Sequence, residues 1–191
     1  MSALLPQHFA LTEALVAAAG AFGIARTARV SPWFALGLAP FACAGLIGAI
    51  RIGTGMTGAV EHLHQFLSRP GALFGLGCLL GALVGRKIWL PPLIGIVAAI
   101  LAILIPAAGT PAFVALIVVG AMAAYRVDAG RGLFAAASFA LLLVGRLATD
   151  PLRVAHPSLA WHLFHLSVAL WLLLIVRIAL LLSDQSHLRR S

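Results

Sequence analysis

The sequence Asp150-Pro-Leu-Arg-Val-Ala-His156-Pro-Ser-Leu-Ala-Trp-His162-Leu-Phe-His165 leads directly into an apolar stretch, residues 166–182. A run of this length and hydrophobicity predicts a helix that crosses a lipid bilayer. His162 and His165 lie three residues apart at its start, so a helix places both imidazoles on one face. Polar side chains are costly in hydrocarbon unless they are paired or bind a ligand, so these histidines predict a functional site.

The composition extends the membrane prediction to the whole chain. Of the 191 residues, 62% are hydrophobic and 9% are charged, whereas soluble domains have about 45–50% apolar and about 25% charged residues. A soluble core of this size cannot bury so much apolar surface. Only helix bundles and closed barrels span a bilayer, and the long segments rich in Leu, Ala and Gly lack the alternation of barrel strands. The predicted fold is an all-α polytopic membrane protein.

Seven apolar segments are separated by polar or turn-forming sequences. The predicted spans are residues 8–25, 33–52, 70–85, 88–105, 112–125, 132–147 and 159–182. Ser31-Pro32 marks the start of the second span, a polar loop from Arg51 to Arg69 precedes the third, and a turn at residues 106–111 precedes the fifth. Short connections favour antiparallel packing of sequential helices. We expect a single transmembrane domain, residues 1–191, built as a seven-helix bundle.

The formal net charge of +8 does not indicate nucleic-acid binding here, because the basic residues lie mostly at the ends of apolar segments. Basic residues gather in the cytoplasmic loops of membrane proteins. Alternate loops carry Arg26 and Arg29, then Arg86 and Lys87, then Arg126 and Arg131, then Arg189 and Arg190. The pattern predicts an N-terminus outside and a C-terminus in the cytoplasm. We expect the membrane to be the bacterial inner membrane.

This topology gathers most of the remaining polar residues on one side of the membrane. The residues are His8 and Glu13 at the first span, Glu61, His62 and His64 before the third, and Asp150, His156, His162 and His165 at the last. Six of the seven histidines and three of the five acidic residues therefore share a side. The result depends only on the number of crossings, so it holds for either orientation of the protein.

Such a cluster favours metal chemistry. Imidazole is the commonest ligand for zinc, and a catalytic zinc uses three protein ligands and a water. The water can attack a carbonyl or phosphoryl centre with help from a carboxylate base. The candidate ligands are His162 and His165, with His64 or His62 as the third. The candidate bases, or partners that orient a ligand, are Glu13, Glu61 and Asp150.

Several of these residues also have structural interpretations. Histidines at the lipid–water boundary often lie among headgroups. If the region of His62 and His64 is helical, the two rings point apart, and His64 would pair with Glu61. Glu13 follows Thr12 near a helix start, where it could act as a capping partner.

Other residues favour purely structural roles. Arg51 and Arg146 near span ends are expected to extend toward the headgroups. Four tryptophans are interpreted mainly as an interfacial belt: Trp33, Trp89, Trp161 and Trp171. The small residues Gly75, Gly77 and Gly81 predict close helix packing of the third span.

The size, the seven spans and Trp161-His162-Leu-Phe-His165-Leu-Ser167 resemble the seven-span membrane hydrolase superfamily of alkaline ceramidases and adiponectin receptors, often called CREST. Thr12-Glu13 also resembles the polar opening of some bacterial members. The resemblance implies zinc held by three histidines, with His162 and His165 matching the pair of the last span, and hydrolysis of amide or related bonds in lipids. The departures are a histidine spacing of three instead of four and Gly48-Ala-Ile-Arg51 where a histidine is expected.

The leading hypothesis is an integral membrane protein with an outward-facing histidine site, a zinc-dependent hydrolase acting on a lipid substrate. One alternative is a transport or sensor protein in which the same histidines respond to protons or metal. The spans offer few inward polar groups, which argues against transport of hydrophilic solutes. Another alternative is a haem-binding protein with His162 or His165 as one axial ligand.

Overall fold

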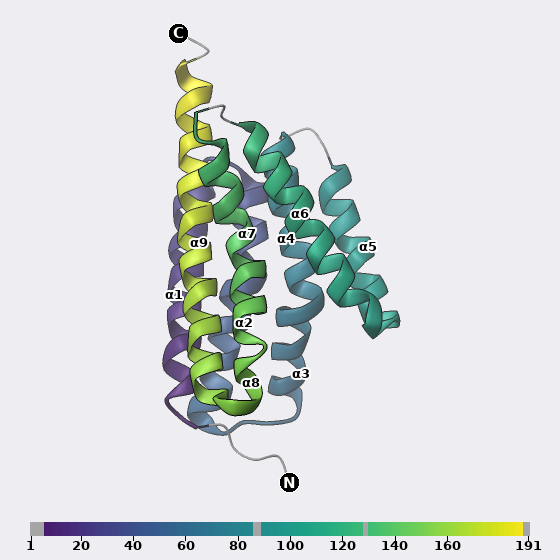
Figure 1. Cartoon of the computed structure of the whole chain (residues 1–191), viewed down its shortest axis with the longest axis vertical. Helices are drawn as coiled ribbons and strands as arrows, with labels where there is room; N and C mark the ends of the chain where they lie inside the picture. The colour runs from purple at the N-terminus through teal and green to yellow at the C-terminus, as the bar shows by residue number, and fades with distance from the viewer. Residues whose placement is uncertain (1–5, 86–88, 128–129, 189–191) are drawn as a thin grey trace.

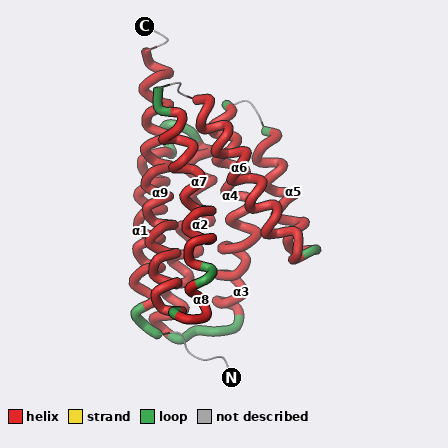
Figure 2. Tube along the Cα trace, viewed as in Figure 1, coloured by secondary structure: helices red, strands yellow, loops and turns green. Residues whose placement is uncertain are grey.

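The computed structural model is an elongated bundle of helices that run up and down along a common axis (Figure 1). It describes residues 6–85, 89–127 and 130–188. Within these ranges all regular structure is helical and no strand occurs, as the tube in Figure 2 makes clear. The prediction of an all-α fold is therefore confirmed.

The bundle consists of long helices joined by short turns. The long helices are α1 (Phe9–Thr27), α2 (Pro32–Thr54), α4 (Ala72–Val84), α5 (Leu90–Leu104), α6 (Gly109–Val127), α7 (Gly132–Thr149) and α9 (Pro157–Leu188). The shorter elements are α3 (Ala59–Phe66), the π-helical turn η1 (Leu67–Gly71), the 3₁₀ turn η2 (Pro106–Ala108) and α8 (Leu152–Ala155).

Six of the described helices are long and apolar enough to cross a membrane, and one of them is the continuous helix Ala59–Val84 formed by α3, η1 and α4. The chain is therefore an integral membrane protein. The predicted count of seven spans is not confirmed, because α5 has only 15 residues. At about 1.5 Å per residue it is about 22 Å long, against a hydrocarbon core of about 30 Å. Prolines lie at both ends of α5: Pro91 and Pro92 are in its first turn, and Pro106 is just beyond its last residue.

The predicted polar loop between Arg51 and Arg69 is wrong. α2 continues through Arg51 and ends at Thr54. Gly55, which follows it, has a φ of 72°, the left-handed conformation that glycine adopts just beyond helix ends. The chain then forms α3 and passes through η1 into α4. The wide π turn accommodates Pro70, which has no backbone N–H to donate. The third span consequently begins earlier than residue 70, and His64 lies on a helix.

Glycines allow two pairs of helices to approach closely. A β-carbon at Gly45 of α2 would lie 2.8 Å from the backbone nitrogen of Ala17 on α1. A β-carbon at Gly77 of α4 would lie 2.6 Å from the α-carbon of Gly95 on α5. Such distances leave no space for a side chain, so these glycines determine how α1 meets α2 and how α4 meets α5. The close packing predicted for Gly77 is confirmed.

The centre of the bundle is apolar. Its most deeply buried large side chains include Leu38, Leu76, Leu79, Phe139 and Trp171. The indole Nε1 of Trp171 donates a hydrogen bond to the carbonyl oxygen of Phe139 at 3.2 Å. The belt prediction is therefore wrong for Trp171, which belongs to the core.

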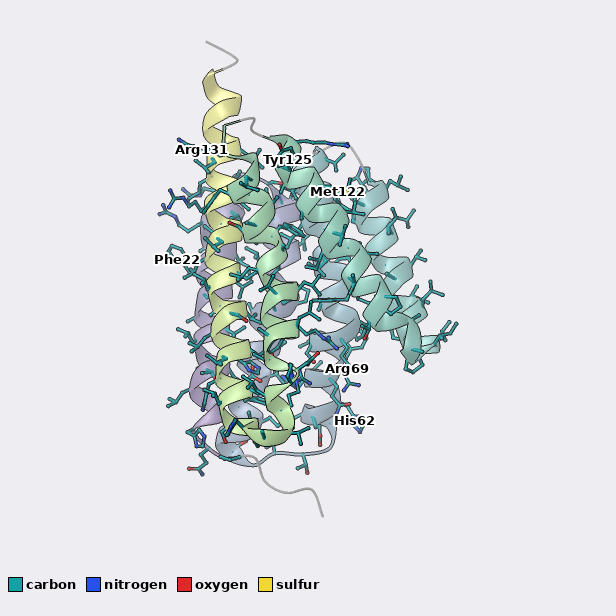
Figure 3. All side chains as sticks on the ribbon, viewed as in Figure 1. Phe22, His62, Arg69, Met122, Tyr125 and Arg131 are labelled. Carbon is teal, nitrogen blue, oxygen red and sulfur yellow. The ribbon has the colours of Figure 1, made fainter. Side chains whose placement is uncertain are left out.

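The predicted histidine-rich side corresponds to one end of the bundle. In Figure 1 the starts of α1 and α9, the ends of α2 and α7, and the short helices α3 and α8 all lie at the lower end. The opposite end carries the described part of the connection between α6 and α7, where Figure 3 labels Tyr125 and Arg131. The bundle thus has two chemically different ends.

Candidate functional site

Glu13 of α1 is the most buried of the acidic side chains that the structure describes, with 2% of its surface exposed. Its carboxylate lies against Gly48 of α2, where a β-carbon would stand 2.6 Å from the carboxylate carbon. One turn earlier, a β-carbon at Gly45 would lie 2.8 Å from the backbone oxygen of Glu13. Two missing side chains on α2 therefore create the space that holds Glu13.

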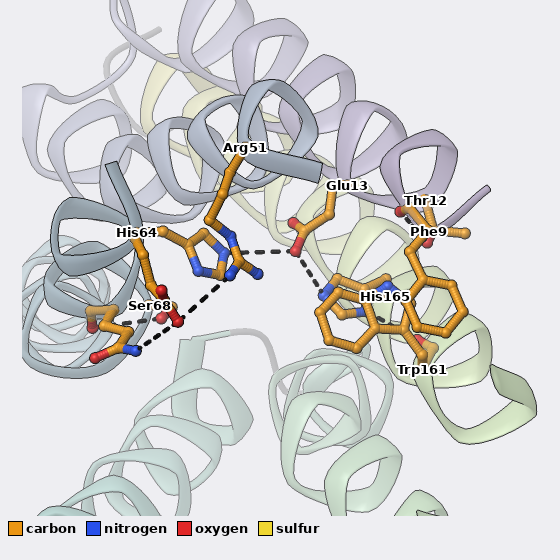
Figure 4. A network of polar contacts seen from close by, with 10 residues as sticks. Phe9, Thr12, Glu13, Arg51, His64, Ser68, Trp161 and His165 are labelled. Carbon is orange, nitrogen blue, oxygen red and sulfur yellow. Dashed lines mark hydrogen bonds and ion pairs between the residues drawn. The ribbon is translucent and has the colours of Figure 1, made fainter. Parts of the chain in front are cut away.

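Two imidazoles from other helices contact one oxygen of this carboxylate. The Nε2 atom of His64 on α3 lies 3.4 Å from Oε1 of Glu13, and the Nε2 atom of His165 on α9 lies 3.3 Å from it. Figure 4 draws both contacts as dashed lines. They are close contacts and not aligned hydrogen bonds, since Oε1 has no hydrogen-bond partner among the described residues. Three helices that are remote in sequence meet at one carboxylate oxygen.

The other ring nitrogen of His165 determines where this ring carries a proton. Nδ1 lies 2.8 Å from the carbonyl oxygen of Trp161, and a carbonyl only accepts, so Nδ1 carries the hydrogen and donates it. A neutral imidazole then presents the lone pair of Nε2 to the carboxylate of Glu13. Two acceptors 3.3 Å apart repel each other unless a proton or another cation lies between them. The Glu13–His165 contact is therefore a place for an exchangeable proton.

Aromatic rings support His165 in this orientation. Trp161 stacks on the imidazole with ring centroids 4.5 Å apart and planes inclined by 25°. Phe9 of α1 stacks on Trp161 at 4.9 Å. The indole Nε1 of Trp161 is buried and has no hydrogen-bond partner in the described part of the chain. Trp161 thus packs within the site and offers it an unused donor.

Arg51 of α2 also borders the site and does not extend freely toward the headgroups. Its side chain is 16% exposed, and its Nη1 atom lies 3.6 Å from Oε1 of Glu61 on α3. Its Nε atom is buried and has no acceptor within the described residues. Arg51 lies three residues after Gly48, so it shares the helix face that meets Glu13. Figure 4 shows it pointing toward the contact between His64 and Glu13.

His162 is separated from this centre, although it lies one turn from His165. Its Nδ1 atom is 3.3 Å from the hydroxyl oxygen of Thr12. Its ring centroid is 5.1 Å from that of His8 and 5.3 Å from that of Phe9. The structure therefore gives the two predicted ligands of the last span different partners, Glu13 for His165 and Thr12 for His162.

The remaining predicted residues lie outside the Glu13 contacts. His62 is exposed on α3 and is labelled in Figure 3. Glu61 binds Arg51 and accepts a hydrogen bond from the side-chain amide of Gln65 at 3.5 Å, so it does not pair with His64. Asp150 contacts Arg153 at 3.0 Å and is 44% exposed.

The donor atoms do not form a metal site as they stand. Across residues 6–85, 89–127 and 130–188, no three His, Cys, Asp or Glu side chains are arranged so that they could hold a metal ion. The two imidazoles and the carboxylate are a donor set that zinc accepts. Binding a metal would require these donors to move toward a common point.

Sequence reasoning identified Glu13, His64 and His165 as candidates but missed their neighbours Arg51 and Gly48. The available signal was the spacing of α2, where Gly45, Gly48 and Arg51 recur every three residues and so share a helix face. The sequence prediction placed a loop at residues 51–69. Without α3, nothing indicated that this face of α2 packs against another helix at Arg51.

Comparisons of the chain with models of known protein families, with curated proteins and with solved structures found no match.

Proposed function

We propose that the protein is a membrane-embedded hydrolase that acts at one face of the bilayer, with Glu13 and His165 as its acid–base pair and His64 as their partner. The observation that carries the proposal is the contact of two imidazole Nε2 atoms with one oxygen of a carboxylate that is 2% exposed. Ionisable residues at membrane depth are costly, and those that persist are usually functional.

The distribution of buried polar groups favours an enzyme with its site at one end of the bundle over a channel or transporter. Away from Glu13, the buried polar residues of the described chain are Thr27, Ser31, Ser138 and Thr149. Thr27 and Thr149 donate to carbonyls of their own helices. Between the two ends lie Leu38, Leu76 and Trp171, which offer no continuous series of proton carriers. This distribution supports chemistry at one end of the bundle.

The proposed chemistry is general base catalysis. Glu13 accepts a proton from a water molecule, and the resulting hydroxide attacks the carbonyl carbon of an ester or amide. The attack moves the negative charge to the carbonyl oxygen. When the tetrahedral intermediate collapses, the bond to the leaving group breaks and Glu13 returns the proton to that group, while His165 and His64 hold the carboxylate in place between these steps. Such a base typically contributes about 10²–10⁴ in rate. The surrounding membrane surface suggests a lipid or lipid-soluble substrate, in agreement with the resemblance of the last span to lipid hydrolases.

Zinc binding by His64, His165 and Glu13 is the second candidate, and a specific observation favours it. The contact distances of 3.3 and 3.4 Å match the distance between neighbouring ligands of a tetrahedral zinc, about 3.3 Å for bonds of about 2.0–2.1 Å. In addition, Nδ1 of His165 donates to a backbone carbonyl, as the second nitrogen of metal-binding histidines commonly does. If bound, zinc would supply a Lewis acid and an acidified water.

Activity is tested on purified protein with a panel of fluorogenic lipid esters and amides. We expect Glu13→Gln to reduce turnover by about 10²-fold or more, and His62→Ala, which changes an exposed histidine of the same helix as His64, to retain it. Turnover that Glu13→Gln leaves unchanged would overturn the proposal, as would the absence of turnover on every substrate. Metal analysis of the same variants tests the second candidate, which requires stoichiometric zinc that His64→Ala and His165→Ala abolish.

We further propose that the site faces the outside of the cell. The end that holds the site carries four basic residues in the described chain, Arg51, Arg69, Arg146 and Arg153. The loops that alternate with it in the sequence carry eight, Arg26, Arg29, Arg86, Lys87, Arg126, Arg131, Arg189 and Arg190. At the other end Arg26, Arg29, Arg126 and Arg131 are exposed. The positive-inside rule favours a cytoplasmic position for that end. Labelling of single cysteines at positions 57 and 131 with an impermeant reagent in intact cells tests the orientation, and only Thr57→Cys should react.

A further inference from the structure

We infer that Arg51 forms an oxyanion site, and that the group it takes is a phosphate. The inference rests on the proposed function, since it names a recognition group for the molecule on which the Glu13 centre acts. The observation behind it is a group of buried polar atoms that lack hydrogen-bond partners. The buried side-chain atoms without a hydrogen-bond partner in the described chain are Oε1 of Glu13, Nε of Arg51, Nε1 of Trp161 and Oγ of Ser31. The first three of these atoms belong to the site.

The guanidinium group of Arg51 is poorly satisfied by the protein. Its acidic partner among the described residues is Glu61, whose Oε1 lies 3.6 Å from Nη1, a distance too long for a good hydrogen bond. Its Nε atom is buried with no acceptor. Arginine presents its donors in a planar fork that matches the oxygens of phosphate or carboxylate. A guanidinium whose buried Nε has no acceptor and whose Nη1 contacts Glu61 only at 3.6 Å indicates a ligand with several acceptor oxygens beside the reactive centre.

The position of Arg51 favours phosphate over other oxyanions. Arg51 lies on the last turns of α2, at the end of the bundle where α3 and α8 also lie (Figure 1). The ends of membrane-spanning helices generally lie near the lipid headgroups, where phosphate is the most abundant oxyanion.

α3 covers Arg51 and Glu13, and its structure would allow it to move and admit the ligand. None of its residues is buried. It is preceded by Gly55 and Gly58, with φ of 72° and 67°, and followed by the π turn η1, a type of turn that is frequent at functional sites. Two side-chain pairs attach it to the bundle, Glu61 to Arg51 and His64 to Glu13. Displacement of α3 would free the guanidinium and the carboxylate together.

Calorimetric titration of the purified full chain in detergent tests the inference. The probes are dioctanoyl phosphatidic acid, inorganic phosphate, and dioctanoylglycerol, which lacks the phosphate. We expect saturable binding of a phosphate probe and none of the glyceride. Arg51→Gln should weaken binding about tenfold or more, since it removes a charge-assisted fork. The matched control is Arg69→Gln, an exposed arginine at the same end (Figure 3), which should bind as the wild type does.

A variant that binds phosphate more tightly than the wild type cannot be explained by misfolding, so it provides a second test. Glu61→Gln removes the carboxylate that competes for Arg51, so it should tighten phosphate binding about threefold or more. Binding of inorganic phosphate as tight as that of phosphatidic acid would identify a soluble phosphate as the ligand, whereas binding of the lipid alone would identify a headgroup. Equal losses in Arg51→Gln and Arg69→Gln would overturn the inference, as would absence of saturable binding of both phosphate probes.

The binding result is independent of catalysis. Glu13→Gln should abolish hydrolysis and keep phosphate binding, because it leaves the guanidinium in place. A protein that binds phosphate through Arg51 but hydrolyses no substrate would overturn the proposed hydrolase and leave the oxyanion site supported.

Discussion

Gly48 lies against Glu13 so closely that a β-carbon at position 48 would stand 2.6 Å from the carboxylate carbon. Gly48→Ala should therefore displace the carboxylate from the space in which both imidazoles contact it. The end of the Glu13 side chain can shift, but the displaced carboxylate then loses its imidazole contacts. We expect a loss of about 1–3 kcal/mol in the free energy of unfolding, the usual cost of leaving a buried polar group without its partners, together with loss of hydrolysis. Reversible unfolding in mixed micelles measures the first effect.

Gly53→Ala is the matched control for Gly48→Ala. Gly53 belongs to the same helix, and a β-carbon there meets nothing within 4 Å. This change should be neutral or stabilising by up to about 1 kcal/mol, because alanine favours the helix more than glycine does. Equal destabilisation by the two variants would show that the space beside Glu13 is not special.

The pairing of Glu13 with His165 predicts a strong energetic coupling. His165→Ala alone leaves the buried carboxylate with one imidazole in place of two, and removing one partner of a buried pair is strongly destabilising. Glu13→Gln removes the charge that needs compensation, so the double variant should be more stable than the sum of the single effects implies. A double-mutant cycle should give a coupling of about 1–3 kcal/mol.

The cycle has an internal reference in His162. This residue contacts Thr12 and not Glu13, so His162→Ala combined with Glu13→Gln should be additive within about 0.5 kcal/mol. A coupling as large as that of His165 would mean that the two histidines act on Glu13 together, contrary to the contacts in the structure.

The membrane fold could be predicted from the sequence because hydrophobicity over about 20 residues is a local property. Position along the chain and span parity also brought Glu13, His64 and His165 to one end. Their convergence could not be predicted, because it depends on α3 continuing into α4 through a π turn. The choice between His162 and His165 depends on which ring faces Glu13, and that is set by helix rotation against α1. A spacing of three residues does not reveal this rotation.

The hydrogen bond from His165 to Trp161 predicts one tautomer of this imidazole. Nδ1 lies 2.8 Å from the carbonyl oxygen, so Nδ1 should stay protonated while Nε2 shares its proton with Glu13. In spectra of protein with ¹⁵N-labelled histidine, the resonance that His165→Ala removes should show a protonated Nδ1. His62, which is exposed, should show the mixture of tautomers usual in water. An Nε2-protonated, neutral His165 would contradict the proposed contact.

The contact of Gly77 with Gly95 predicts how the short helix α5 is held. A β-carbon at Gly77 would lie 2.6 Å from the α-carbon of Gly95 and 2.9 Å from the carbonyl oxygen of Pro91, so Gly77→Ala must push α5 away from α4. Much of the other surface of α5 is exposed, including Leu93 and Ile100, so few contacts replace those lost. We expect a cost of about 1–3 kcal/mol and faster amide hydrogen exchange within residues 90–104. Gly109→Ala is the control, because its β-carbon would meet only Ala102 at 3.4 Å, an ordinary contact distance. Faster exchange in both variants, or in neither, would mean that the glycine contact does not hold α5 in place.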